Sequence, residues 1–329
     1  DWSSDVCSSD LDRIPDDAGR DEEETRHIDL ERIDSLPLDT ALSIVGEETR
    51  AEIILQLGDA RSTDPSASNA LGFSELMTRV GAEDSGGFNY HLGKLVGTFV
   101  GKTDDGYRLR LPGQLLYRAL VAGTITERRT IEPSPIGDCP RCDGQLSWAY
   151  HPDHLLTVEC VSCETLFDAI HFPTRGLENR STEAILDAAY GRRHHEVGAM
   201  RRGACHGCGG IVERSLQPGA SITYGSGSVE EMAGLDVYAV LACEACKTSL
   251  VGHPTNVALT APVVVGFFAD HGRDVALSRW WDDPIAAARD AMDIVGKDPQ
   301  AVEIPFEIDG NRLEILVDAD LQVVEVERS

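Results

Sequence analysis

The sequence predicts a multidomain α+β protein, and three observations support this fold class. Apolar residues recur at helical spacing through residues 38–131, four CxxC pairs follow between residues 139 and 246, and alternating strands end the chain. At about 100–200 residues per domain, a length of 329 residues corresponds to two or three domains. The longest apolar run, residues 261–269, is shorter than the ~20 residues that a membrane span needs, so we expect no membrane partner.

The chain is strongly acidic and poor in lysine. It carries 56 acidic against 29 basic residues, a net charge of -27, and only four of the basic residues are lysines. This composition resembles the proteins of extreme halophiles, in which a high net charge keeps the chain in solution. Residues 38–131 differ, because their 12 acidic and 10 basic residues make them nearly neutral. A surface that approaches a polyanion is expected to carry few excess acidic side chains.

Residues 1–37 are expected to lie outside the folded domains. The first eleven residues, DWSSDVCSSDL, resemble translated sequencing-adapter DNA, which would leave the native N-terminus missing; the alternative is a native disordered tail. Residues 12–35 are acidic and have almost no large apolar side chains, a composition typical of disorder. Because no basic and apolar leader is visible, we expect a cytoplasmic protein.

Residues 38–131 predict helices followed by a hairpin and a further helix. Periodic apolar residues and capping residues place the first helices at 41–46, 47–58, 74–81 and 84–96. Ser74 is expected to cap the third, and Val96 to close the apolar stripe of the fourth. Asp104-Asp105-Gly106 is a tight-turn signal. Strands flank it at 99–102 and 107–111, and an amphipathic helix follows at 113–126. This is the order of a winged helix-turn-helix.

The same residues resemble the ArsR-type winged helix of haloarchaeal transcriptional regulators. The resemblance covers residues 38 to about 127 and is carried by ALSIVGEETRAEIILQL, FSELMTRVG and FNYHLGKLVGTFVGKTDDGYRLRLPG. It implies a DNA-binding protein, commonly a homodimer, that places the fourth helix in the major groove and the wing against the DNA backbone. The residues that it places at DNA are Ser85, Asn89, Tyr90, His91, Lys94, Lys102, Arg108 and Arg110.

Two interpretations of this domain stay open. Asn side chains can pair with adenine, and Lys and Arg side chains neutralise phosphates, which favours DNA binding. Alternatively, the winged helix serves protein contacts only, and Tyr90 and His91 are packed core residues. The third helix has no paired cysteines such as metal-sensing members carry, so the resemblance does not support metal sensing by that route.

Eight of the nine cysteines form CxxC pairs, which predicts two structural Zn²⁺ sites. The candidate ligands are Cys139, Cys142, Cys160 and Cys163 in a first zinc ribbon, and Cys205, Cys208, Cys243 and Cys246 in a second. The pairs of the first ribbon are 17 residues apart, a common zinc spacing, whereas 34 residues separate those of the second and indicate an insertion. Gly144 and Gly210 suit turns that aim backbone N–H groups at sulfur.

Alternatives to two zinc ribbons have less support. A rubredoxin-like iron site has the same ligands, and crossed pairing of the CxxC turns stays open. A thioredoxin-like site needs a βαβ context, and disulfides need an oxidising compartment. His151, His154, His171 and His206 are expected to lie at the surface or beside the ligands rather than to bind metal.

The rest of the chain predicts a linker helix and a small C-terminal α+β unit. Residues 181–200 form the linker helix, capped by Ser181. Beyond it we expect helices at 260–269 and 284–295 and strands at 273–281, 302–308, 312–317 and 321–327. Trp280 and Trp281 are more typical of packing than of a ligand pocket. The predicted segments are therefore 1–37, 38–131, 132–180, 181–200, 201–256 and 257–329.

The predicted architecture is a winged helix-turn-helix followed by two four-cysteine zinc ribbons and a C-terminal α+β unit. Since no catalytic motif occurs at a spacing that specifies a reaction, we expect no enzyme. The predicted function is sequence-specific binding of double-stranded DNA by an ArsR-like transcriptional regulator. The alternative is a zinc-ribbon interaction module whose winged helix docks on protein partners. A metal- or redox-switched sensor would need labile cysteines, and the sequence identifies no effector.

Overall fold

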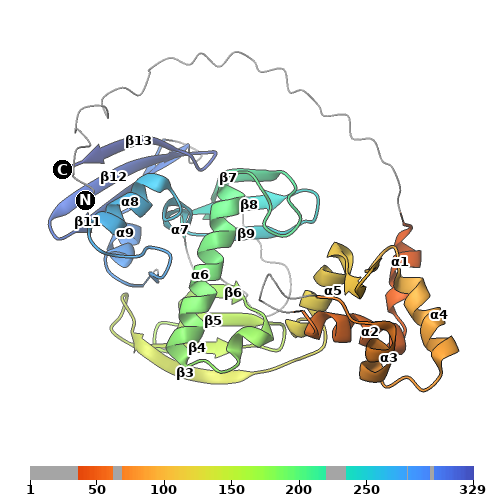
Figure 1. Cartoon of the computed structure of the whole chain (residues 1–329). Coiled ribbons are helices and arrows are strands. Elements are labelled where there is room, and N and C mark those ends of the chain that lie inside the picture. The colour runs from red at the N-terminus through yellow and green to blue at the C-terminus, as the bar shows by residue number, and fades with distance from the viewer. Residues whose placement is uncertain (1–35, 62–68, 220–234, 280, 297–299) are drawn as a thin grey trace, which may run out of the picture. The chain divides into compact units, whose positions relative to one another are not determined.

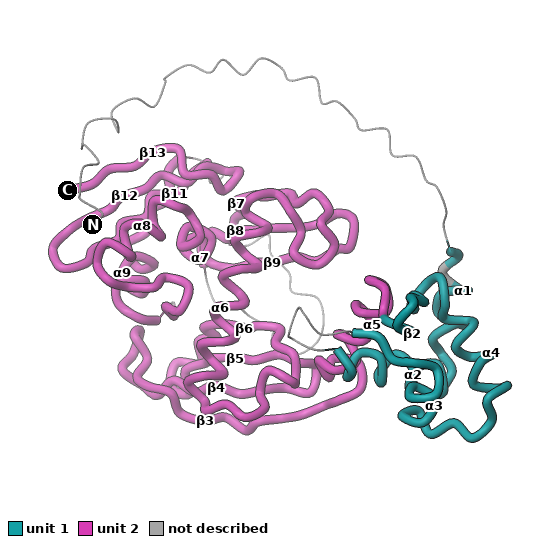
Figure 2. The backbone as a smooth tube through the Cα atoms, in the orientation of Figure 1, with its two compact units in different colours: residues 1–108 teal, residues 109–329 magenta. Residues whose placement is uncertain are grey.

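The computed structural model describes residues 36–61, 69–219, 235–279, 281–296 and 300–329. The chain divides into two compact units, unit 1 (residues 1–108) and unit 2 (residues 109–329) (Figure 2). The predicted acidic tail up to residue 35, most of the polar loop expected at 63–69, most of the insertion of the second ribbon and Trp280 lie outside the described residues. No described helix combines the length and the apolar character that a membrane crossing needs.

The described part of unit 1 consists of helices followed by a wing-like hairpin, as the sequence predicts (Figure 1). The elements are α1 (Leu38–Val45), α2 (Glu48–Asp59), α3 (Phe73–Val80), α4 (Ser85–Leu95), β1 (Val100–Thr103) and β2 (Gly106–Leu109). Glu47 and Asp84 cap α2 and α4, because each carboxylate accepts hydrogen bonds from two backbone N–H groups of the first turn. These caps determine where the two helices begin.

Two details of unit 1 differ from the prediction. Gly72 rather than Ser74 occupies the N-cap of α3, which begins at Phe73. The Phe73 ring packs edge-on against Phe88 with ring centroids 5.1 Å apart, so α3 begins where its first aromatic side chain reaches the core. Val96 is not part of the buried stripe of α4, because the helix ends before it and the residue is 37% exposed.

The hairpin of unit 1 is attached to the segment that precedes α3. Leu71 and Tyr107 exchange two backbone hydrogen bonds of 2.9 Å. Gly106, which precedes Tyr107, has a φ of 131°, and a Cβ there would overlap the Leu71 carbonyl group. Only glycine fits this position. The sequence analysis does not predict this third strand contact, because Leu71 stands outside any alternating pattern.

Unit 2 opens with α5 (Leu111–Val121), which is shifted from the predicted helix at 113–126. Pro112 lies in its first turn, where a residue without an N–H group costs no helical hydrogen bond. Gly123 follows the helix with a φ of 78°, the left-handed conformation that commonly ends helices.

The described strands of unit 2 form three antiparallel sheets in which neighbours in sequence pair. The first sheet contains β3 (Ile131–Asp138), β4 (Gln145–Tyr150), β5 (Leu155–Cys160) and β6 (Leu166–His171). The second contains β7 (Val212–Pro218), β8 (Val237–Cys243) and β9 (Ser249–Gly252). The third contains β10 (Asp293–Val295), β11 (Ala301–Ile308), β12 (Asn311–Asp318) and β13 (Val323–Arg328). Each predicted zinc ribbon contains a hairpin, β4–β5 in the first and β7–β8 in the second, and β3, β6 and β9 extend these hairpins.

Helices connect these sheets. They are a short 3₁₀ helix (Thr174–Leu177), α6 (Thr182–Arg201), α7 (Pro254–Ala258), α8 (Pro262–Asp270) and α9 (Ile285–Asp290). α6 is the predicted linker helix, and Ser181 caps it by accepting a hydrogen bond from the Ala184 N–H. In Figure 1, α6 runs from the first sheet toward the second. Its buried residues include Ile185, Leu186, Ala189 and Val197.

One hydrophobic cluster connects the three sheets and α6. It includes Trp148 of the first sheet, Leu186 of α6, Leu241 of the second sheet and Phe306 of the third. The two ribbons and the C-terminal sheet therefore share a core within unit 2. The segment boundaries predicted from the sequence stay a prediction.

The C-terminal region departs most from the sequence analysis. No strand forms at 273–279 or at Trp281, where turns connect α8 to α9. The helix predicted at 284–295 ends at Asp290, and β10 follows it. The helix predicted at 260–269 begins at Pro262 and is preceded by the unpredicted α7. The last three strands are as predicted. The alternating apolar residues of β11 and β12 are buried, whereas β13 is exposed beyond its first residue.

The two ribbons repeat one order of elements. In each, a CxxC turn is followed by a hairpin, a second CxxC turn, a third strand and a Pro-Thr pair, after which α6 or α8 begins. The pairs are Pro173-Thr174 and Pro254-Thr255, and both threonines are fully buried. The insertion in the second hairpin hides this repeat in the sequence.

Candidate metal centres and nucleic-acid interface

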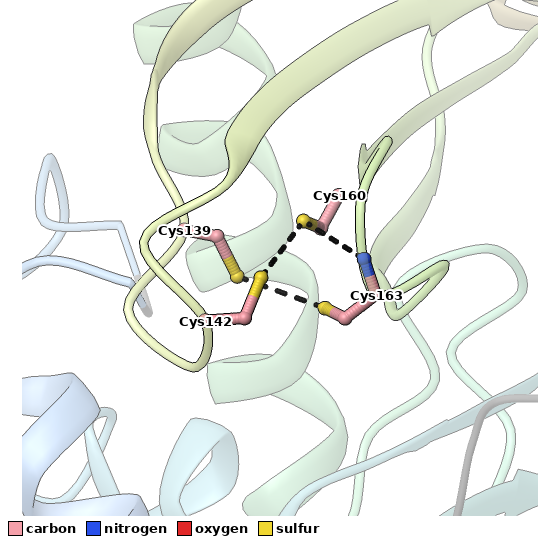
Figure 3. Close-up of side chains that lie close together, drawn as sticks. All are labelled: Cys139, Cys142, Cys160 and Cys163. Carbon is pink, nitrogen blue, oxygen red and sulfur yellow. Dashed lines mark hydrogen bonds between the residues drawn. The ribbon is translucent and has the colours of Figure 1, made fainter.

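The first cysteine cluster joins two turns at one end of the first sheet. Cys139 and Cys142 lie between β3 and β4, and Cys160 and Cys163 lie where β5 passes into β6. Figure 3 shows the four side chains directed toward one another. Cys139 and Cys160 are buried, whereas Cys142 and Cys163 are exposed.

The sulfur atoms of this cluster have the spacing of a zinc site. The Sγ atoms of Cys139 and Cys163 are 3.9 Å apart, and those of Cys142 and Cys160 are 3.5 Å apart. All four lie within 4.8 Å of one another. Tetrahedral Zn²⁺ with Zn–S bonds of about 2.3 Å separates its sulfur ligands by about 3.8 Å. The cluster therefore fits one structural Zn²⁺ ion.

The second cluster has the same construction. Cys205 and Cys208 precede β7, Cys243 is the last residue of β8, and Cys246 follows it. The Sγ–Sγ distances from Cys205 to Cys246 and from Cys208 to Cys243 are both 3.6 Å. Neighbouring CxxC turns pair as predicted, and among the described residues no other group of His, Cys, Asp or Glu side chains has this clustered arrangement. The chain thus has two four-cysteine clusters typical of structural zinc.

The CxxC turns of both clusters share one backbone conformation. The residue after each second cysteine has a positive φ, between 55° and 74°. Its N–H donates to the carbonyl oxygen of the first cysteine over 2.9–3.0 Å. These residues are Asp143, Glu164, Gly209 and Lys247. The tight turn brings both thiols of a pair to one side, which a metal ion requires.

Backbone N–H groups point at sulfur in these turns, as predicted for Gly210. The Gly210 N–H donates to Cys208 Sγ over 3.4 Å, and a Cβ at Gly210 would lie only 3.1 Å from Cys243 Sγ. The N–H groups of Arg141 and Ser162 likewise donate to the buried sulfurs of the first cluster, each over 3.4 Å. Hydrogen bonds of this kind stabilise the thiolate that binds the metal.

Two threonines beside the clusters were missed by the sequence analysis. Thr165 Oγ1 is 3.3 Å from Cys163 Sγ, and Thr248 Oγ1 is 3.2 Å from Cys246 Sγ. Both stand second after a closing CxxC pair, in CVSCET and CEACKT, and this recurrence is the signal that could have identified them. Their hydroxyls can donate to the exposed thiolate of each cluster.

The thiols within a cluster differ in pKa. Burial raises the pKa of Cys139 to about 12, whereas the Thr165 hydroxyl and N–H lower the pKa of Cys163 to about 6. In the second cluster, Thr248 likewise lowers the pKa of Cys246 to about 6. Since Zn²⁺ binds thiolates, its binding releases the remaining protons and weakens as the pH falls.

α4 of unit 1 has a buried face and a polar exposed face. The buried face consists of Phe88, Leu92 and Leu95. The exposed residues include the predicted set Ser85, Asn89, Tyr90 and Lys94. Tyr90 is 59% exposed and so is not a core residue, and the Lys94 ammonium lies 5.3 Å from its ring centroid. The helix therefore offers an amide, a phenol and an ammonium group to an outside partner.

His91 is the least accessible of the residues predicted to lie near DNA. Its side chain is 26% exposed, and Nδ1 lies 3.0 Å from the carboxylate of Glu47, the N-cap of α2. Partial burial opposes ionisation of Glu47, but N–H groups of Thr49 and Arg50 and the nearby His91 together lower its pKa. His91 thus connects α4 to the beginning of α2.

The basic residues predicted for the wing are exposed. Lys102 lies in β1 and Arg108 in β2, and both side chains face solvent. The Lys102 ammonium lies 5.8 Å from the Tyr107 ring centroid. Arg110, also exposed, stands at the N-cap of α5 in unit 2.

Two known protein families match the chain. Residues 38–120 match the family described as "Domain of unknown function (DUF7347)", and residues 136–323 match the family described as "Domain of unknown function (DUF7351)". The comparisons with curated proteins and with solved structures found no match. Because residues 136–323 are more than half of the sequence, the chain belongs to the DUF7351 family.

Proposed function

We propose that the chain is an ArsR-like winged-helix transcriptional regulator that binds specific sequences of double-stranded DNA through unit 1. The observation that carries the proposal is the exposed polar face of α4, which is followed by a basic wing in a nearly neutral segment of a strongly acidic chain. The zinc ribbons are structural in this proposal, and no enzymatic reaction belongs to it.

The face of α4 suits the major groove in shape and in chemistry. The groove admits an α-helix, and an Asn side chain such as Asn89 can pair with the N6 and N7 atoms of adenine. Ser85 and Lys94 add a hydroxyl and a cation on the exposed surface of the same helix. A base contact such as the pairing of Asn89 with adenine supplies sequence preference, which phosphate contacts cannot.

Gly93 supports a close approach to α4. It lies within the helix, is exposed, and a Cβ there would have no atom within 4 Å, so packing inside the chain does not require a glycine. Glycine in a helix interior costs about 0.5–1 kcal/mol relative to alanine. A partner whose backbone passes close to α4 would account for a residue that the fold does not need.

The wing supplies cations for phosphates. Lys102 and Arg108 are exposed on β1 and β2. Each phosphate contact releases condensed counterions, so binding of this kind weakens steeply as salt rises. If the protein works in concentrated salt, where the Debye length is about 3 Å at 1 M, recognition must rest on close contacts rather than on steering.

A homodimer is part of the proposal. α5 carries Leu111 and Leu115, four residues apart on one side of the helix and 63% and 54% exposed. A second copy of the chain would cover them, as the resemblance to ArsR-type regulators implies. Analytical ultracentrifugation of the zinc-loaded chain tests this part, and a monomer at all concentrations would contradict it. A regulator of this type works where the DNA is, in the cytoplasm.

The experiment is a binding titration with the full, zinc-loaded chain. Random and promoter-derived duplexes are compared from low to molar KCl, and the proposal expects sequence-preferring binding. The double variant Lys94→Ala/Arg108→Ala should bind more weakly. Its plot of log K against log salt should be less steep by about 2, because each lost phosphate contact removes about 0.9 from the slope.

The matched control removes two positive charges from unit 2. Arg175→Ala/Arg328→Ala changes side chains that are 70% and 52% exposed, and it should leave affinity and slope unchanged. Absence of binding at every salt concentration at which the protein is folded would contradict the proposal. That outcome would favour the alternative of an interaction module whose winged helix docks on protein.

A further inference from the structure

An open hollow in unit 2 is lined by several arginine side chains. It lies between the end of α5, the 3₁₀ helix with the loop that follows it, and the middle of α6. Its volume is about 850 Å³, which is within the range of small-molecule sites. We call it the arginine hollow after the four exposed residues Arg118, Arg175, Arg180 and Arg192.

This grouping of cations stands out in an acidic unit. Residues 109–329 carry 32 acidic and 19 basic residues, yet Glu178 is the one acidic residue in the lining of the hollow. Composition alone would give the opposite balance. The local excess of positive charge therefore marks a place where the surface suits an anion.

Two of the four arginines are paired within the chain. The Arg175 guanidinium lies 2.7 Å from the Glu178 carboxylate, and that of Arg192 lies 2.8 Å from Glu196. Arg118 and Arg180 form no ion pair with a described residue. Their guanidinium groups can therefore pair with an anion from outside the chain.

The segments that carry the arginines are fixed by close packing. The Tyr150 hydroxyl donates to the Phe172 carbonyl oxygen over 2.7 Å. A Cβ at Gly176 would overlap the Phe172 ring, so this ring packs directly on the backbone of the 3₁₀ helix. The Arg175 N–H donates to the Ala122 carbonyl oxygen over 3.2 Å, which attaches the 3₁₀ helix to the end of α5. The hollow therefore exists before a ligand enters it.

The second ribbon repeat shows that the repeated fold does not need these arginines. After Pro173-Thr174, the first repeat continues with the exposed residues Arg175 and Arg180. After Pro254-Thr255, the second repeat continues with residues 256–261, which contain no charged side chain and are almost entirely buried. Packing of the common scaffold thus does not explain the arginines, whereas contact with a ligand would.

The lining indicates the chemistry of the ligand. A guanidinium group pairs with phosphate oxygens through two parallel hydrogen bonds, and cations from three separate segments suit a ligand with several charged oxygens. Among the other lining residues are Val121, Phe172, Pro173 and Ala188, whose apolar atoms suit a ring or an alkyl group. A ligand that carries two or three phosphates and an aromatic ring meets both requirements.

We propose that the arginine hollow binds a nucleoside di- or triphosphate, with Arg118 and Arg180 contacting the phosphates and the apolar lining covering the base. All of these residues belong to unit 2. The site does not depend on DNA binding by unit 1, and its test contains no DNA, so the failure of one proposal would leave the other standing.

The test is calorimetric titration of the full, zinc-loaded chain at constant KCl. ADP, ATP and GTP are the probes, and pyrophosphate and adenosine are the controls that each carry one part of a nucleotide. At least one nucleotide should bind saturably and about tenfold or more tighter than either control. No saturable binding of any nucleotide would overturn the proposal. Equal affinity for pyrophosphate or for adenosine would do so too, because one side of the hollow would then contribute nothing.

A pair of double variants connects the binding to these residues. Arg118→Gln/Arg180→Gln should weaken nucleotide binding about tenfold or more, because two charge-assisted contacts are lost. Its circular dichroism spectrum should be unchanged, since both side chains are exposed.

The matched control is Arg202→Gln/Arg273→Gln, which removes the same charge outside the hollow. Arg202, like Arg118, is exposed and forms no ion pair with a described residue. Arg273 donates to the Asp283 carbonyl oxygen, as Arg180 does to that of Gly176. The control should bind nucleotide as the original chain does. Unchanged affinity in the hollow variant, or an equal loss in the control, would contradict the assignment.

Discussion

Gly93 and Gly106 lie in the same unit, but the fold requires glycine only at Gly106. At Gly106 the backbone has a left-handed φ and passes against the Leu71 carbonyl, so the fold itself requires glycine. At Gly93 a side chain would meet nothing. Gly106 is therefore explained by the fold of the chain, and Gly93 by the partner that we propose for α4.

We expect Gly93→Ala to stabilise unit 1 and to weaken DNA binding. An alanine in a helix interior should raise the free energy of unfolding by about 0.5–1 kcal/mol. Urea unfolding followed by circular dichroism measures this, and the duplex titration measures the affinity. Gly106→Ala is the contrasting variant and should destabilise the unit. Equal DNA affinity in Gly93→Ala and the original chain would remove this support for the proposed interface.

Thr165 and Thr248 should tune the metal sites without being ligands. Replacing either by valine keeps the shape and removes the hydroxyl beside Cys163 or Cys246. Loss of a group that bonds to a metal ligand typically lowers metal affinity about 10–100-fold. Competition with a zinc chelator measures the change, and Thr124→Val, at an exposed threonine outside both clusters, is the control. Unaltered zinc affinity in both valine variants would show that the hydroxyls do not contribute.

Among the elements, α4 depends on its cap. Asp84 accepts hydrogen bonds from the N–H groups of Gly86 and Gly87, at 3.0 and 2.7 Å, and these bonds lower its pKa. Two glycines in the first turn weaken the helix, so we expect the Asp84 cap to be important for fixing where the helix begins.

We expect unit 1 to lose stability as the pH falls into the range in which carboxylates are protonated. The folded pKa of Asp84 is lowered, so its contribution is present above its unfolded pKa of about 3.9 and is lost as the pH falls through the folded value. Asp84→Ala should lower the Tm at pH 7. It should also reduce the fall in Tm as the pH is lowered below 5. Glu83→Ala, at the exposed neighbouring position, should not. An unchanged pH profile in Asp84→Ala would contradict the capping role.

The sequence analysis succeeded for elements whose signals are local. The helices of unit 1 and the last three strands follow from apolar periodicity, and the Asp-Gly turn was correctly placed. It failed at 273–279, at Trp281 and beyond Asp290, where no periodic pattern distinguishes a strand from a turn that is held by tertiary packing. The outer strands β3, β6 and β9 were not predicted, because they form by pairing with the ribbon hairpins and not through a signal in their own sequence.

At the scale of the molecule, one hydrophobic cluster runs through unit 2. Cys139 and Cys160 of one cluster and Cys205 and Cys243 of the other are members of the same hydrophobic cluster. Loss of metal from one site therefore exposes core that the other site shares. Unit 1 has no cysteine among its described residues and is expected to be independent of the metal.

Removal of zinc by a strong chelator should unfold unit 2 and leave unit 1 folded. Structural zinc sites couple metal binding to folding, so the β signal and the protease resistance of residues 109–329 should be lost together. Circular dichroism and limited proteolysis with mass spectrometry measure the two units separately. A chelated unit 2 that stays folded and protease-resistant would show labile cysteines and favour a metal-switched sensor.

Salt should stabilise the whole chain. The net charge of -27 produces self-repulsion, and in the third sheet Glu314 stands directly opposite Glu327, and Asp293 opposite Glu303. Raising KCl from about 0.1 M to about 1 M shortens the Debye length from about 10 Å to about 3 Å, so the Tm should rise. Glu327→Gln should raise the Tm at low salt and reduce the further rise in Tm that added KCl produces. A Tm that falls across this range would contradict repulsion as the dominant effect.

The sequence by itself determined the ligands of both metal centres, the helical order of unit 1 and the residues that α4 exposes. These follow from spacing and periodicity within short segments, where covalent connection keeps the interacting groups close. The tertiary structure alone decided the shared core of unit 2, the attachment of the wing at Leu71 and the threonines beside the cysteines. These features arise where segments distant in sequence meet. Apolar periodicity within a segment carries no information about which distant segment it will contact.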